Sequence, residues 1–106
     1  MVARGDIWLA ALDPAVGSEI RKTRPCVVIS PPEMHDHLRT VTVAPMTTGS
    51  RPAPYRIPVT HASKKGLILL DQIRTLDKAR LVRKWGAVSA GTLTAPLRTL
   101  QEVFGE

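Results

Sequence analysis

The chain of 106 residues has few aromatic side chains and almost no thiol chemistry. Aromatic residues make up 4% of it, and Cys26 is its only cysteine. A single cysteine excludes an intrachain disulfide, and its place between Pro25 and a β-branched run favours inert packing over a reactive thiol. Few aromatic rings also leave little surface for stacking bases. Trp8 and Trp85 fall in predicted strands, where a core or interface position is favoured over a stacking surface.

Long apolar segments are missing as well. The longest wholly apolar run, residues 66–70, is far shorter than the roughly 20 residues of a membrane-spanning helix. The first residues lead into a predicted strand and lack the apolar stretch of a signal peptide. We therefore expect a cytoplasmic protein with no membrane among its partners.

Signatures of several common chemistries are also absent. The sequence has no glycine-rich phosphate loop, no cysteine pair for zinc and no Gly-x-Ser-x-Gly nucleophile elbow. His35 and His37 flank Asp36, but they follow two prolines and have no further ligands nearby, which favours a solvated loop over a metal site. His61 is isolated in the sequence and is predicted to lie at the surface. We expect no metal and no other cofactor.

Positive charge is the feature that the sequence does contain. Fifteen Lys and Arg residues oppose nine Asp and Glu residues, which gives a net charge of +6 and favours an anionic partner such as nucleic acid or an acidic peptide. Charge alone is also compatible with a basic protein that has no such partner. The charge is densest in GSEIRKTRPCVVIS, residues 17–30, where Arg21, Lys22 and Arg24 precede a strand. A solvated turn has no need of Arg24 at the strand entrance, whereas a phosphate-binding site does.

Most of the chain has the pattern of short strands separated by turn residues. Apolar and β-branched runs predict strands at residues 6–12, 26–30, 40–44, 55–59, 66–76 and 81–88. Thr94 is predicted to cap a C-terminal helix with Pro96 in its first turn. Leu97, Leu100, Val103 and Phe104 then share one helix face. Residues 33–38 favour a further short turn of helix.

These elements predict one domain, residues 1–106, that is mainly β with a C-terminal helix, in the α+β class. The length suits one compact core and is too short for a second. Five or six short strands in about a hundred residues favour a small, strongly bent barrel over alternating βαβ units.

Three segments together resemble the MazF/PemK family, the toxin half of toxin-antitoxin pairs. They read GDIWLAALDPAVGSEIRKTRPCVVIS, VAPMTTGS and GLILLDQIRTLDKARLVRKWGAVS, and they cover nearly the whole chain in order. The resemblance implies an SH3-like barrel that forms a homodimer and has an acidic antitoxin as partner. It also implies a metal-independent, sequence-specific endoribonuclease that cleaves single-stranded messenger RNA by attack of the 2′-hydroxyl and so inhibits translation and growth.

The same resemblance implies the site residues. The family's functional arginine, threonine and loop glutamate fall on Arg24, Thr47 and Glu19, which are the predicted catalytic residues. The predicted RNA-binding residues are Ser18, Arg21, Lys22, Asp71, Gln72 and Arg74.

The residue types suit that chemistry. The planar fork of Arg24 can hold two phosphate oxygens, Thr47 can add a neutral hydrogen bond, and Glu19 is a candidate acid or base. Structural roles remain open from the residues alone: Arg24 could bridge a surface turn, Glu19 could pair with a neighbouring cation, and Thr47 could cap a turn. In a continuous strand, Gln72 and Arg74 would share one face and Asp71 would lie on the other.

Two other function classes remain open at this stage. One is a gyrase-poisoning toxin of the CcdB type, whose fold is similar, although the ending Val103-Phe104-Gly105-Glu106 lacks the Trp-Gly-Ile-like end of that type. The other is a catalytically silent RNA-binding or antitoxin-sequestering module. The loop segment Ile20-Arg21-Lys22-Thr23 is more cationic and stiffer than the glycine-containing loop of many relatives, so no RNA recognition sequence can be carried over.

Overall fold

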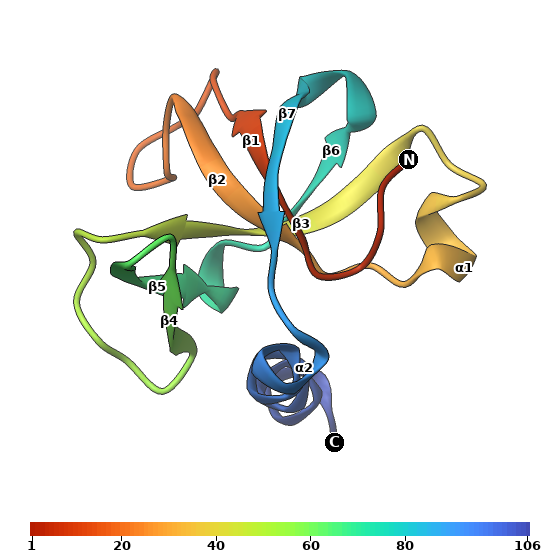
Figure 1. Ribbon diagram of the computed structural model, residues 1–106. Helices are drawn as coiled ribbons and strands as arrows, with labels where there is room; N and C mark the ends of the chain where they lie inside the picture. The colour runs from red at the N-terminus through yellow and green to blue at the C-terminus, as the bar shows by residue number, and fades with distance from the viewer.

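The computed structural model describes residues 1–106 and shows a strongly bent antiparallel sheet with one long helix beside it (Figure 1). The strands are β1 (Asp6–Ala11), β2 (Thr23–Val28), β3 (Thr40–Thr47), β4 (Arg56–His61), β5 (Lys64–Leu69), β6 (Arg74–Asp77) and β7 (Leu81–Ala87). The helices are α1 (Pro32–His35) and α2 (Ala90–Phe104), and two 3-10 turns are η1 (Leu70–Gln72) and η2 (Lys78–Arg80). Neither α-helix combines the length and the apolar character needed to cross a membrane.

The sheet runs in the order β4-β5-β3-β2-β1-β7, and β6 pairs with β3 off this path. No backbone ladder joins the two edge strands β4 and β7. The predicted mainly β fold with a C-terminal helix is confirmed, and the bent sheet stays open along the seam between β4 and β7.

Strand β3 is longer than predicted because it continues through Pro45 to Thr47. One side of β3 pairs with β2, while the other side pairs first with β6, over Thr40–Val43, and then with β5, over Met46 and Thr47. Pro45 lies between these two registers, so its missing backbone N–H interrupts neither ladder. The prediction that the strand ends at Pro45 is therefore wrong.

The predicted strand over residues 66–76 is two strands separated by η1. Strand β5 pairs with β4 and with the end of β3, whereas β6 pairs with the beginning of β3. Since η1 turns the chain between them, the strict alternation predicted for Asp71, Gln72 and Arg74 does not hold.

Helix α2 begins earlier than predicted, and Ser89 is its N-cap. The Ser89 hydroxyl accepts a hydrogen bond of 3.1 Å from the Thr92 amide, while Thr94 lies inside the helix and donates to the Ala90 carbonyl at 3.2 Å. Pro96 is likewise inside the helix and not in its first turn. The prediction of Thr94 as the cap is wrong because Ser89 can satisfy the free amides one turn earlier.

Two apolar clusters fill the two sides of the bent sheet. The first contains Ile7, Val27 and Ile68, and α2 covers it with Leu93, Leu97 and Leu100. The second contains Ala10, Leu12, Cys26, Val28, Val41, Val43 and Leu76. Burial raises the pKa of the Cys26 thiol to about 12, which keeps the thiol protonated and confirms its interpretation as inert packing.

His35 also differs from the sequence prediction, because it is buried and not part of a solvated loop. It ends α1, so the short helix predicted over residues 33–38 is present but ends at residue 35, and the His35 side chain is 1% exposed. Its Nδ1 lies 2.9 Å from the Ser30 hydroxyl and its Nε2 lies 3.1 Å from the Val2 carbonyl. Both ring nitrogens are therefore hydrogen-bonded, and burial of the ring is compatible with its polarity.

Ser89→Ala is expected to lower the free energy of unfolding by about 1 kcal/mol, because it removes the N-cap of α2. Thr94→Ala is the matched control: its hydroxyl bonds only within the helix, and alanine favours helices, so little change is expected. Urea unfolding of both variants measures the difference. An equal loss in the two variants would contradict the assignment of the cap.

Candidate functional site

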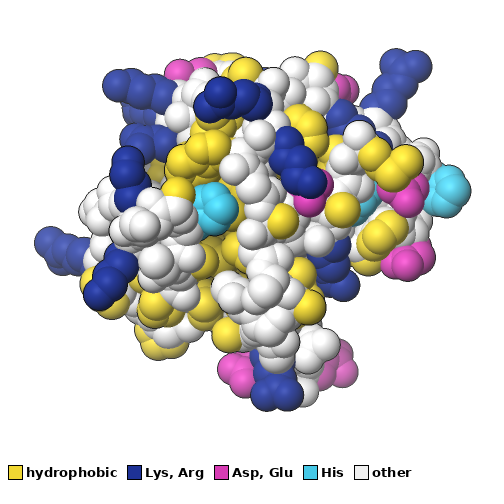
Figure 2. Space-filling model, viewed as in Figure 1, with side chains coloured by type: hydrophobic (Ala, Val, Ile, Leu, Met, Phe, Trp, Pro, Cys, Tyr) yellow, Lys and Arg dark blue, Asp and Glu magenta, His cyan; other side chains and the backbone are white.

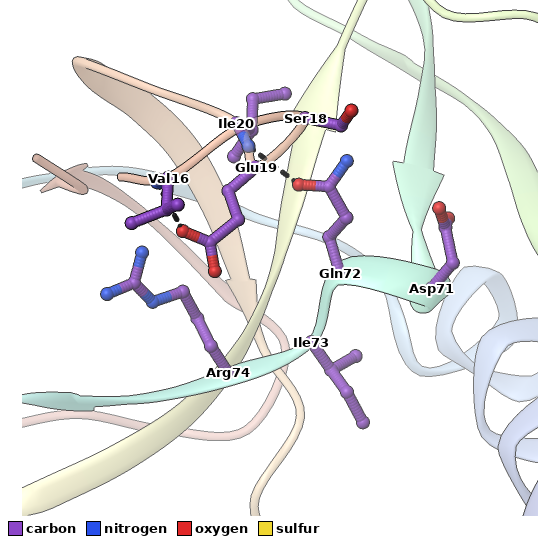
Figure 3. Close-up of a pocket in the computed structure, with 8 residues that line it drawn as sticks. All are labelled: Val16, Ser18, Glu19, Ile20, Asp71, Gln72, Ile73 and Arg74. Atoms are coloured by element: carbon purple, nitrogen blue, oxygen red, sulfur yellow. Dashed lines mark hydrogen bonds between the residues drawn. The ribbon is translucent and has the colours of Figure 1, made fainter. Parts of the chain in front are cut away.

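Seven of the nine site residues predicted from the sequence line two hollows of the surface. The loop hollow has a volume of about 490 Å³ and is lined by Val16, Ser18, Glu19, Ile20, Asp71, Gln72, Ile73 and Arg74 (Figure 3). The Arg24 hollow has a volume of about 210 Å³ and is lined by Arg24, Pro25, Met46, Thr47, Thr48, Val59, His61, Lys64, Lys65, Gly66 and Trp85. Arg21 and Lys22 line neither hollow.

Gln72 fixes the β1–β2 loop over the loop hollow. Its side-chain oxygen accepts a hydrogen bond of 2.7 Å from the Ile20 amide, which joins η1 to the loop (Figure 3). Glu19 is also bound locally, because its carboxylate accepts a hydrogen bond of 2.6 Å from the Val16 amide. The two contacts give the wall of this hollow a defined shape.

Asp71 is held in an ion pair with Arg56 of β4. The Nε and Nη2 atoms of Arg56 donate to the two carboxylate oxygens at 3.2 and 3.0 Å, and Nη1 donates to the Arg51 carbonyl at 3.0 Å. The hydrogen bond to Asp71 raises the pKa of Arg56 above its ordinary value. Asp71 thus anchors η1 to the neighbouring strand.

Arg74, the last of the polar residues in the loop hollow, is partly engaged by the backbone. Its Nη1 donates to the Leu12 carbonyl at 3.2 Å, and its side chain extends toward the β1–β2 loop (Figure 3). Ile73 points away from the hollow's polar side chains (Figure 3). Arg74 therefore supplies positive charge at the wall formed by the loop.

The Arg24 hollow collects side chains from five strands at the open seam of the sheet. Arg24 comes from β2, Thr47 from the end of β3, and Lys64 and Lys65 from β5. No Asp or Glu lines it, so three cations face the hollow without a neighbouring carboxylate. Such a surface attracts anions. Figure 2 shows groups of Lys and Arg side chains around a strip of exposed hydrophobic atoms on the face that carries β7.

Arg24 and Thr47 keep hydrogen-bonding capacity free for a ligand. The Nε of Arg24 donates to the Arg21 carbonyl at 3.2 Å, and its two terminal amino groups have no partner within the chain. The Thr47 hydroxyl accepts from the Gly49 amide at 3.3 Å, which leaves its own hydrogen to be donated. Thr47 can therefore cap its turn and still donate to an anion in the hollow.

Gly66 sets the position of Thr47. A Cβ atom at residue 66 would lie 2.9 Å from the Thr47 carbonyl oxygen, so only glycine allows this close approach of β5 to β3. Thr47 pairs with Leu67 directly beside it. The backbone of β5 thereby holds Thr47 in the hollow.

The lysines and the aromatic residues of this hollow were not among the site residues predicted from the sequence. His61, predicted as an isolated surface residue, packs edge-on against Trp85, with ring centroids 5.2 Å apart and an angle of 66° between the planes. Trp85 is 38% exposed and lines the hollow. No local pattern signals this contact, because His61 ends β4 and Trp85 belongs to β7 at the opposite edge of the sheet.

The fold and the basic hollow agree with one class of protein. The chain matches the model of the PemK-like, MazF-like toxins of type II toxin-antitoxin systems over residues 3–104. Because the match covers almost the entire chain, the protein belongs to this family.

Individual relatives agree with this assignment. The chain is 42% identical over 90 residues to the endoribonuclease MazF of Staphylococcus epidermidis, across 79% of this chain and 75% of the relative. Among solved structures, the Mycobacterium tuberculosis toxin MazF-mt6 has a TM-score of 0.77 at 26% identity, covering 93% of this chain and 95% of that one. A mycobacterial endoribonuclease in complex with its cognate antitoxin has a TM-score of 0.82 at 22% identity, covering 99% and 96%, and supports the fold.

Gln72→Ala is expected to raise the hydrogen-exchange rate of the Ile20 amide by about fivefold to tenfold, since one hydrogen bond contributes about 1 kcal/mol. Gln101→Ala on the exposed face of α2 is the control and leaves that rate unchanged. Exchange measured by NMR resolves the single amide. Unchanged protection of Ile20 in Gln72→Ala would show that Gln72 does not hold the loop.

Proposed function

We propose that this toxin is a sequence-specific endoribonuclease that cleaves single-stranded RNA without a metal ion. One observation carries the proposal: Arg24 and Thr47, from two different strands, share one hollow with Lys64 and Lys65 and with no carboxylate. The endoribonuclease named among its relatives, at 42% identity, supports the same reaction class. Cleavage of messenger RNA by such an enzyme would inhibit translation and growth.

The reaction that fits the hollow uses the RNA's own 2′-hydroxyl as nucleophile, so the protein need not activate a water molecule on a metal. The bond from O2′ to phosphorus forms while the bond from phosphorus to O5′ breaks. The products are a cyclic phosphate and a 5′-hydroxyl end. The protein must stabilise the charge on the non-bridging oxygens, remove the proton from O2′ and allow a proton to reach O5′.

Arg24 and Thr47 suit the first of these tasks. The terminal amino groups of Arg24 are free and can bind two phosphate oxygens, and the Thr47 hydroxyl can donate to the same group. Lys64 and Lys65 add long-range attraction for the backbone on either side of the scissile phosphate.

The loop hollow suits recognition of a base next to the cleaved bond. Ser18, Gln72 and Arg74 offer polar groups there. Arg21 and Lys22, which lie outside the hollow, add positive charge to the same β1–β2 loop as Ser18. Asp71 supports this wall through its ion pair with Arg56. Glu19 lines this hollow and not the Arg24 hollow, so it is the less well placed candidate for proton transfer to or from atoms bound beside Arg24 and Thr47.

We propose two protein partners in addition to RNA. An acidic antitoxin segment would be attracted by the same cations that attract RNA. A second copy of the chain would form a homodimer through apolar surface that is exposed in the monomer. Val82 is 62% exposed, Val103 54% and Phe104 70%.

The direct test incubates the purified protein with a defined single-stranded RNA in the presence of a chelator and sequences the new 5′ ends. Cleavage at one recurring sequence, with 5′-hydroxyl ends, is expected. Intact RNA that nevertheless binds the protein would identify a silent RNA-binding module. Inhibition of DNA gyrase with intact RNA would identify a toxin of the CcdB type.

Arg24→Lys is expected to lower the cleavage rate by more than about tenfold, because lysine keeps the charge and loses the two-pronged contact with phosphate. Thr47→Val removes one hydrogen bond to the transition state and is expected to raise the barrier by about 2 to 4 kcal/mol. Single-turnover cleavage measures both effects. Near-normal cleavage by Arg24→Lys would remove Arg24 from the catalytic machinery, and loss of folding in Thr47→Val would favour a turn-capping role for Thr47.

Reversing Arg21 and Lys22 to glutamate is expected to weaken RNA and antitoxin together, since both ligands need the positive loop. The control reverses Arg39 and Arg98, which are exposed and line neither hollow, and makes the same change in net charge. Association rates at two salt concentrations measure the effect, because charge steering is screened by salt. Unchanged antitoxin affinity alongside lost RNA binding would show that the two ligands use different surfaces.

A further inference from the structure

The Arg24 hollow contains only one side chain whose type ordinarily titrates near neutral pH. Its titratable lining consists of Arg24, Lys64, Lys65 and His61. Arginine and lysine are normally protonated at pH 7, whereas a histidine exchanges its proton near this pH. Glu19 lines the other hollow and accepts a hydrogen bond from the Val16 amide. His61 is therefore the only ordinary proton acceptor in the hollow that holds Arg24 and Thr47.

The imidazole of His61 has a defined place at the seam. Trp85 contacts it edge-on, and Gly86 lies directly beneath it: a Cβ atom at residue 86 would come within 2.6 Å of Cε1 and 2.8 Å of Nε2. A glycine at this point of β7 is what allows the ring to lie there. The ring therefore lies between the two edge strands, in the space that Gly86 leaves open and against the Trp85 ring.

The ring nitrogens of His61 are free. Neither forms a hydrogen bond within the chain, whereas both nitrogens of the buried His35 are satisfied. The charged groups that face His61 in the hollow are Arg24 of β2 and Lys64 and Lys65 of β5, and β7 presents Trp85 and Gly86. A half-buried ring with an unused nitrogen lone pair is suited to accept a proton from a bound ligand.

We propose that His61 is the general base of the cleavage step, which rests on the ribonuclease function proposed above. The neutral ring takes the proton of the 2′-hydroxyl as O2′ bonds to phosphorus, while Arg24 and Thr47 bind the non-bridging oxygens. The bond from phosphorus to O5′ breaks, and O5′ takes a proton from water. The imidazolium then releases its proton to solvent, so the enzyme returns to its starting state.

The test is the single-turnover rate of RNA cleavage between pH 5 and pH 9 for the wild type, His61→Gln, Gly86→Ala and the control His37→Gln. The wild-type rate is expected to fall toward the acidic end of this range, because a protonated ring cannot accept a second proton. His61→Gln is expected to lower the rate by on the order of a hundredfold or more and to remove this acidic limb. His37 is exposed and lies outside both hollows, so His37→Gln retains the rate and the limb.

Gly86→Ala keeps His61 in the chain but displaces its ring. It is expected to lower the cleavage rate at least tenfold while thermal unfolding shows a folded protein. A substrate with sulfur in place of O5′ shows whether His61 acts as general base or as general acid. The leaving thiolate needs no proton, so its departure does not depend on an acid. This substrate should not restore the rate of His61→Gln.

The outcomes separate this proposal from the function on which it rests. If the wild type cleaves no RNA, the ribonuclease function is wrong. If the wild type cleaves and Arg24→Lys is impaired, the ribonuclease function stands. In that case, a wild-type rate or an unchanged acidic limb in His61→Gln would overturn the role of His61. Rescue by the sulfur substrate, or loss of the acidic limb in Glu19→Gln instead, would also overturn the assignment of His61 as the base.

Discussion

The structure depends on β3, which pairs with three other strands. Its two ends bind different partners on one side, β6 at Thr40–Val43 and β5 at Met46 and Thr47, while β2 pairs on the other side. One continuous strand can serve both only if the sheet bends sharply between them, and Pro45 lies at that point. The bend turns the β4–β5 hairpin toward β7 and leaves the seam at which the Arg24 hollow forms (Figure 1).

This geometry explains why a small chain can place so much positive charge around a fixed site. Arg24 and Thr47 lie at strand ends whose positions are set by ladder hydrogen bonds, and Gly66 brings β5 against the Thr47 backbone. Little backbone entropy is therefore lost when an anion binds, because the backbone beneath the charged side chains is already ordered. The adjoining β1–β2 loop is held by Gln72 from η1, so the walls of both hollows are tied to the same sheet.

Much of the fold was predictable from the sequence, and each wrong prediction has a physical cause. The β class, the terminal helix and the burial of Cys26 follow from residue patterns that act over a few positions. The end of β3 and the cap of α2 were misplaced because tertiary pairing overrides the tendency of Pro45 to end a strand, and because Ser89 competes with Thr94 as a cap. The contact of His61 with Trp85 and Gly86 could not be predicted from the sequence, because it joins opposite edges of the sheet that only the bend brings together.

The most direct test of the central claim is a crystal structure of the protein with an RNA that carries hydrogen in place of the 2′-hydroxyl at the cleavage position. Such an RNA binds but lacks the nucleophile. We predict that the scissile phosphate lies in the Arg24 hollow, with its oxygens within hydrogen-bonding distance of Arg24 and Thr47, and that the neighbouring base enters the loop hollow. A phosphate bound elsewhere, for example along α2, would contradict the assignment of this seam as the active site.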